Sequence, residues 1–137
     1  VSMRKRRAVT NHIGTVHAIA MCNLAELAAG TMTEVTIPAA MRWLPKGMAV
    51  EYLRKAESDV EAHARANQSF LMLQTCHPDA WPAHQRARAM LEQLREPMKI
   101  AYGPGRDVPV TVEVKDRAGE IVCRAVITMW VSPRRKS

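Results

Sequence analysis

The C-terminal part of the chain shows the clearest alternation of hydrophobic and polar positions. Over residues 108–115 four valines alternate with three polar residues and a proline, which is the period-two pattern of a half-buried strand. Residues 116–119 read Asp-Arg-Ala-Gly and supply a turn. Residues 120–132 form a long return strand that Pro133 ends. The pattern therefore predicts an antiparallel hairpin.

Three further strands are expected earlier in the chain. Residues 60–67 alternate valine or alanine with charged and polar side chains, which predicts a half-buried strand. Residues 2–10 read as a basic strand. Residues 48–58 read as another, after a loop that carries Pro38 and Pro45.

The most informative segment is a predicted helix over residues 17–31. It is apolar nearly all round, so we expect it to be buried on most sides. Thr15 offers an N-cap, and Gly30 is the expected end of the helix. Before that glycine the only polar side chains in the helix body are Asn23 and Glu26. We expect Asn23 to make a packing hydrogen bond rather than to act in catalysis.

The order of elements predicts one α+β domain over residues 1–137. A strand, a buried helix and then several antiparallel strands fit one long central helix wrapped by a curved antiparallel sheet. Apolar residues at helical spacing over 84–96 predict an additional amphipathic helix. We expect it to form a helical insertion near 78–98.

The net charge of +7 is concentrated at the two ends of the chain, in residues 4–7 and 134–136. Three interpretations stay open: a solubilising surface, attraction of a polyanionic ligand such as coenzyme A, and nucleic acid binding. Nucleic acid binding is supported by the net charge alone, so we expect no nucleic acid partner. No apolar run is long enough to span a membrane, and no membrane association is expected.

The cysteines indicate a cytoplasmic protein with reduced thiols. Cys22, Cys76 and Cys123 are scattered, with no CxxC spacing. Cys22 has no basic neighbour to activate it, so a cysteine nucleophile is not expected. Cys76 and His77, together with His84, provide too few ligands at known spacings for a metal site.

One string of residues resembles a known family. Asn11, His17, Leu24 and Glu26 fall without a gap on the signature of the hotdog-fold thioesterases of the phenylacetate-pathway type. That signature is Asn or Gln, five residues, His-Gly-Gly, four residues, Leu, one residue, then Asp or Glu. The segment also resembles an uncharacterised thioesterase-like branch of the hotdog proteins. Residues 68–106 do not fit the compact family outline and look like an insertion.

The resemblance implies roles for the residues that match it. Glu26 corresponds to the general base or nucleophile that attacks the thioester. Asn11 and His17 correspond to the residues that place and polarise the thioester carbonyl, and the N–H of Ala18 adds to this. Gly14 and Thr15, in the turn before the helix, are expected to contact substrate.

The chain departs from the family at one point. Where the family has His-Gly-Gly, this sequence has His17, Ala18 and Ile19. An N–H donor survives the change, but the close approach that glycine allows is reduced. The departure bears on the shape of the acyl pocket, and it supports the alternative of a non-catalytic hotdog module that binds an acyl ligand or a protein partner.

The chemistry is consistent with the resemblance. No Lys or Arg occurs from residue 8 to residue 41, and burial without a counter-ion disfavours an ionised carboxylate. A carboxylate poised in this way suits general-base attack by water. The free N–H groups at the start of the helix suit the oxyanion of a tetrahedral intermediate. The alternative is a buried Glu26 that hydrogen-bonds a neighbouring backbone group.

Spacing predicts that the site is shared between subunits. His17 and Glu26 are nine residues apart, which is about 13 Å of rise on one helix. They cannot both reach one thioester from the same chain. We therefore expect a homodimer or a dimer of dimers.

Together these features predict a thioesterase that acts on an acyl-CoA or acyl-carrier substrate. It releases acid plus thiol, and no cofactor is implied beyond the coenzyme A of the substrate. Arg42, Arg54 or Lys55 could hold the nucleotide phosphates, and the sequence does not choose among them.

Overall fold

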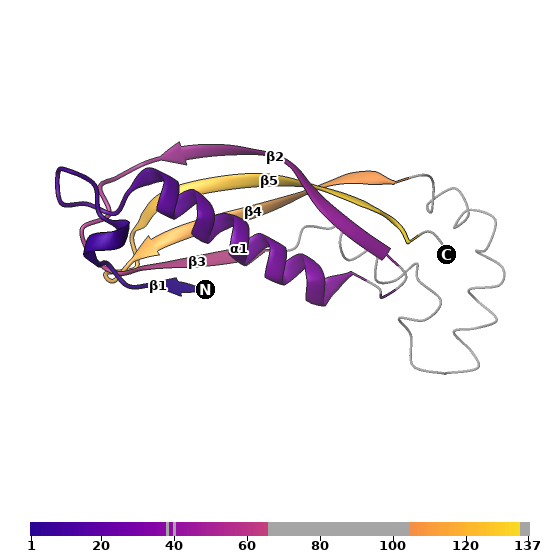
Figure 1. Cartoon of the computed structure of the whole chain (residues 1–137), viewed down its shortest axis with the longest axis horizontal. Helices are drawn as coiled ribbons and strands as arrows, with labels where there is room; N and C mark the ends of the chain where they lie inside the picture. Colours follow the sequence, from indigo (N-terminus) through magenta and orange to yellow (C-terminus); the bar gives the residue numbers. More distant parts are fainter. Residues whose placement is uncertain (38, 40, 66–104, 135–137) are drawn as a thin grey trace.

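The structure is a computed structural model that describes residues 1–37, 39, 41–65 and 105–134. One long helix, α1 (Ala18–Thr36), lies across one face of a five-stranded antiparallel sheet (Figure 1). The predicted α+β fold is confirmed. The sheet has the order β1-β3-β4-β5-β2, with strands β1 (Ser2–Met3), β2 (Met41–Tyr52), β3 (Val60–Arg65), β4 (Arg106–Asp116) and β5 (Ile121–Pro133).

The predicted C-terminal hairpin is confirmed as β4 and β5. The two strands pair antiparallel along their length, and the carboxylate of Asp116 accepts hydrogen bonds from the N–H groups of Ala118 and Glu120 in the turn. Gly119 has a φ of +85°, a left-handed conformation that glycine adopts without steric cost. Alternation along the strands and the turn residues thus fix the register together.

The core lies between α1 and the inner face of the sheet. Alternate side chains of the two central strands are fully buried there, among them Val108, Val110, Val112, Val114, Ile127 and Met129. The helix meets them with small side chains, Ala25, Ala28 and Ala29, which are also buried. Because alanine adds little bulk, the helix backbone packs close to the valines of the sheet.

The ends of the N-terminal elements differ from the prediction. Of the expected strand 2–10 only Ser2–Met3 joins the sheet; a 3-10 turn, η1 (Arg7–Val9), follows it, and Thr10 forms an isolated bridge with Val16. The helix continues to Thr36, so Gly30 is not its end. Gly30 lies inside α1, buried against the Trp43 side chain. Gly30 therefore allows a close contact with Trp43, and the prediction that it ends the helix is wrong.

The strand after the helix is also earlier than expected. It spans Met41–Tyr52 rather than residues 48–58, and it includes Pro45, which was placed in a loop. β2 is an edge strand, and its register shifts between Pro45 and Gly47. A proline is tolerated at such a place because the missing N–H is not needed for pairing.

The remaining predictions are confirmed in part or lie outside the described residues. β3 covers Val60–Arg65 of the expected strand 60–67. The helix predicted at 84–96 and the insertion near 78–98 lie outside the described residues, as does the segment 68–106 except for its last two residues. Within the described ranges, no helix combines the length and apolar character needed to cross a bilayer.

Candidate functional site

The helix α1 buries only the face that lies against the sheet. Ile19, Leu27 and Val35 on the opposite side are 60%, 57% and 77% exposed. Glu26 and Asn23 are exposed as well. The predictions of an all-round buried helix, of a buried Glu26 and of a packing hydrogen bond for Asn23 are therefore wrong for the single chain. The apolar side chains form two faces, and only one of them meets the core.

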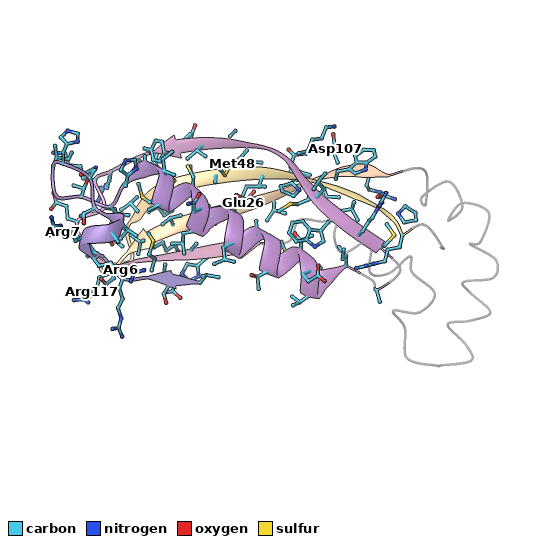
Figure 2. All side chains as sticks on the ribbon, viewed as in Figure 1. Arg6, Arg7, Glu26, Met48, Asp107 and Arg117 are labelled. Atoms are coloured by element: carbon cyan, nitrogen blue, oxygen red, sulfur yellow. The ribbon has the colours of Figure 1, made fainter. Side chains whose placement is uncertain are left out.

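Glu26 lines a groove of about 560 Å³ along this exposed face. Its side chain lies toward the middle of the helix, beside β2 (Figure 2). Glu34 follows Glu26 by two helical turns, about 12 Å along the axis. The volume is within the range of small-molecule sites. The groove is lined by Asn23, Glu26, Leu27, Gly30, Thr31, Glu34, Val35 and Trp43.

Trp43 of β2 forms one wall of this groove, and the sequence did not predict its role. Its indole N–H donates a hydrogen bond of 2.5 Å to a carboxylate oxygen of Glu34. A Cβ atom at Gly30 would lie only 2.9 Å from the ring. Asn23, Gly30 and Glu34 do follow the helical spacing of Glu26, a signal that could have been used. Trp43 lies on a strand and carries no such signal.

At the start of α1, Asn11 organises a tight turn. Its side-chain oxygen accepts hydrogen bonds of 3.1 Å from the N–H groups of Ile13 and Thr15. Its amide donates to the Thr15 hydroxyl at 2.8 Å. Gly14, with a φ of +78°, completes the turn. Most of the hydrogen-bonding capacity of Asn11 is therefore used to shape this loop.

The residue that caps α1 is His17, not Thr15. The Nδ1 atom of His17 accepts a hydrogen bond of 3.1 Å from the N–H of Ile19. Thr15 is buried and bonded to Asn11. The prediction that Thr15 is the N-cap is therefore wrong. Because Nδ1 acts as the acceptor, the exposed His17 ring has its Nε2 atom left to interact with another molecule.

A second cleft, of about 380 Å³, lies at this end of the helix. The predicted site residues Asn11, Thr15 and Ala18 line it, together with side chains from the end of β2 and the loop after it, namely Tyr52, Leu53, Arg54 and Lys55. Ala18 and Glu26 are eight residues apart, about 12 Å along α1. Of the residues expected to hold the carbonyl, Asn11 and Ala18 line this cleft, whereas His17 does not, and Glu26 lies in the other groove.

Tyr52, which lines the second cleft, and Cys22 join β2 to α1. The thiol and the phenol are 2.9 Å apart. This hydrogen bond, followed by burial and the negative field of the thiol, raises the pKa of Tyr52 to about 12. Burial raises the pKa of the Cys123 thiol to about 11, so that thiol stays protonated and unreactive at neutral pH.

The link between Tyr52 and Cys22 predicts a change in alkaline titration. The pKa of Tyr52 in the folded protein lies above its usual value of 10.0. The neutral phenol therefore stabilises the fold below about pH 10, and this stabilisation is lost between about pH 10 and 12. We expect Cys22→Ala to move the pKa of Tyr52 down toward 10. The ultraviolet absorbance of tyrosinate measures it, with Tyr52→Phe identifying the signal. An unchanged Tyr52 titration in Cys22→Ala would contradict the assignment.

No three His, Cys, Asp or Glu side chains converge on a possible metal site in the part of the chain that the structure describes. The residues weighed as metal ligands in the sequence, Cys76, His77 and His84, lie outside it.

The chain is similar to one sequence family and to several solved structures. The sequence model of a family described as "Domain of unknown function (DUF4442)" matches residues 1–131. No curated protein matches the chain. A solved structural-genomics protein designated APC5556 is 41% identical with a TM-score of 0.66, and the match covers 97% of this chain and 69% of that one.

Two more distant solved structures share the fold. PA5026 from Pseudomonas aeruginosa, named a protein of unknown function and probable thioesterase, is 21% identical with a TM-score of 0.66 over 97% of this chain and 74% of its own. BH2602 from Bacillus halodurans, solved with CoA, is 16% identical with a TM-score of 0.64 over 95% of this chain and 64% of its own.

Proposed function

This chain belongs to the DUF4442 family, and we propose that it is a thioesterase that hydrolyses an acyl-CoA or acyl-carrier thioester to an acid and a thiol. The observation that carries the proposal is the position of Glu26, whose carboxylate lines a groove beside the central helix. The spacing of Asn11, His17, Leu24 and Glu26 supports the same activity. It is also the reason for proposing that the chain is related to the phenylacetate-pathway branch of the hotdog thioesterases. Proteins of the same fold named thioesterase or solved with CoA add support.

In the proposed reaction Glu26 takes a proton from water as the oxygen attacks the thioester carbon. Direct attack by the carboxylate is the alternative, with water hydrolysing the resulting anhydride. The N–H of Ala18, with His17 and Asn11, stabilises the oxyanion of the tetrahedral intermediate. The carbon–sulfur bond then breaks, and the thiolate takes the proton held by Glu26.

A homodimer completes this site. The carbonyl-holding residues and Glu26 are about 12 Å apart on one helix. Two antiparallel copies of α1 related by a two-fold axis at the level of Cys22 would set Ala18 of one copy opposite Glu26 of the other. β2 is an edge strand, so it can continue the sheet into the second copy. The exposed Ile19 and Leu27 side chains would then be covered.

The carrier end of the substrate would lie near the start of α1. Arg54 and Lys55 line the cleft there, although Arg54 also pairs with Glu120 at 3.0 Å. Arg6 and Arg7 lie at the same end of the molecule (Figure 2). Cations at that end would hold the phosphates of coenzyme A. Arg42, at the other end of β2, is the less suitable of the predicted residues.

A specific observation favours a second candidate, a non-catalytic module that binds an acyl ligand or a protein partner. Asn11 uses its side chain to hold its own turn, and the Gly-Gly of the family is replaced by Ala18 and Ile19. Both features reduce what is available to polarise a carbonyl.

Thiol release from short, medium, long and aromatic acyl-CoAs distinguishes the two candidates. We expect turnover of at least one acyl class by the wild-type protein. Binding of acyl-CoA without any thiol release across the panel would reject the thioesterase and support the binding module.

A further inference from the structure

Four polar side chains of α1 line the groove, and they differ in whether their hydrogen-bonding groups already have partners. The Thr31 hydroxyl donates to a backbone carbonyl of its own helix at 2.8 Å. The Glu34 carboxylate accepts the hydrogen bond from the indole of Trp43. The side chains of Asn23 and Glu26 make no hydrogen bond or ion pair in the part of the chain that the structure describes. The groups that remain available to a ligand therefore belong to Asn23 and Glu26.

Asn23 and Glu26 are neighbours on one face of the helix. Both are exposed, and because they are three residues apart their Cβ atoms lie about 5–6 Å from each other. No hydrogen bond joins the two side chains directly. A water molecule that donates to two oxygen atoms, each at about 2.8 Å, bridges a gap of similar size. The spacing thus suits one water held between the amide oxygen of Asn23 and a carboxylate oxygen of Glu26.

The two side chains differ in what they can do with the protons of such a water. The Glu26 carboxylate can accept a hydrogen bond and then take the proton, as a general base does. The amide oxygen of Asn23 can accept a hydrogen bond but does not take the proton. Asn23 therefore fixes the direction of the water, and with it the direction of the lone pair that attacks.

The proposed dimer places this pair beside the thioester. With the two-fold axis at the level of Cys22, Ala18 of the other copy is opposite Glu26, and Asn23 lies about one helical turn from Glu26 toward the axis. The part of the other α1 at this level, residues 18–21, contains only alanine, isoleucine and methionine. It offers no polar side chain to the amide. An amide that is covered without a hydrogen bond is unfavourable, and a bound water removes that cost.

We propose that Asn23 is a second catalytic residue, which holds the attacking water against Glu26 through its amide oxygen. The inference rests on the proposed function and deepens it. One proton of the water moves to the Glu26 carboxylate as the water oxygen bonds to the thioester carbon, and the carbonyl electron pair moves to the oxyanion. The second proton stays on the attacking oxygen, hydrogen-bonded to Asn23. When the carbon–sulfur bond breaks, the thiolate takes the proton from Glu26, and the acid keeps the other.

The test is the rate of thiol release by Asn23→Ala and Asn23→Asp, on an acyl-CoA that the wild type hydrolyses. Asn23→Ala should lower kcat about a hundredfold, the loss that misplacement of a reacting group causes. KM should stay within about twofold of the wild-type value, since no contact to the substrate is removed. Aspartate keeps an oxygen acceptor in the same place. At pH 8, well above the usual pKa of an aspartate, about 3.9, Asn23→Asp should be at least about tenfold faster than Asn23→Ala.

The fold and the dimer are expected to survive these substitutions. Alanine is a better helix former than asparagine, and Asn23 is exposed in the single chain. Thermal melting and light scattering check both properties. Thr111→Ala is a control for the loss of an exposed polar side chain, because Thr111 lies on β4 and lines neither cleft. It should keep the wild-type kcat and KM. A dimer that dissociates in Asn23→Ala would assign Asn23 to the subunit contact and overturn the inference.

The remaining outcomes separate this inference from the proposed function. A folded Asn23→Ala with wild-type kcat, when Glu26→Gln is inactive, would overturn the inference and keep the thioesterase. So would an Asn23→Asp variant as slow as Asn23→Ala. A loss confined to KM, matched by weaker binding of S-alkyl-CoA thioethers, which cannot be hydrolysed, would make Asn23 a substrate contact and overturn the inference too. No turnover of any acyl class by the wild type would reject the thioesterase and the inference with it.

Discussion

Glu26→Gln is expected to lower the kcat for acyl-CoA hydrolysis by about a thousandfold, within the range that general-base catalysis contributes. Glutamine keeps the shape of the side chain and its position in the groove, but it cannot accept the proton of an attacking water or attack as a carboxylate. The binding of the acyl-CoA should change little, because the groove walls stay in place. Thiol release measures kcat, and titration with an S-alkyl-CoA measures binding.

Glu57→Gln is a suitable control for this experiment. Glu57 is exposed in the loop between β2 and β3 and does not line either cleft. Among the residues that the structure describes, its one hydrogen bond runs from Lys5 to its backbone carbonyl, so the side chain takes no part. The substitution removes the same charge from the chain, and the wild-type rate should remain. If Glu26→Gln turned over as fast as the wild type, the active site would have to lie elsewhere.

The strands of the sheet centre and the hairpin could be predicted from the sequence because their signals are local. The valines of β4 alternate with a period of two, and the Asp116 turn fixes the pairing with β5. The presence of a long helix after residue 17 was equally clear. Each of these features depends on a few neighbouring residues, and the tertiary structure does not compete with them.

The exposure of the helix could not be predicted in the same way. Apolar residues on both faces of α1 give the same pattern whether the second face meets a core, a partner or solvent. Gly30 is a related case, since its role becomes visible only when Trp43 of β2 is placed against it. Pro45 suggested a loop because a sequence does not reveal that β2 is an edge strand.

The roles of the candidate site residues stay a prediction, but the local arrangement at the start of the helix differs from the one expected. Thr15 was expected to cap α1, yet its hydroxyl is taken by Asn11 and His17 takes over the cap. The separation of Glu26 from Ala18 did follow from the helical rise alone. A distance along one helix is fixed by local geometry, whereas the choice among capping groups depends on how the preceding turn folds.

That separation leads to the prediction of subunit complementation. In a two-fold dimer each proposed site takes Glu26 from one chain and His17 from the other. Glu26→Gln removes the first group. His17→Asn removes the second, since asparagine is a strong N-cap and can keep the hydrogen bond to Ile19 while the Nε2 atom is lost. Each variant alone should show little hydrolysis in both of its sites.

A heterodimer of the two variants should recover about half of the wild-type activity, because one of its two sites has both groups intact and the other lacks both. Coexpression with two different tags and purification through both gives this heterodimer. Thiol release is then compared with the wild type and with each homodimer. If Glu26 and His17 acted within one chain, each site of the heterodimer would lack one group and activity would stay at the level of the variants. A monomer by light scattering that still hydrolysed thioesters would contradict the shared site directly.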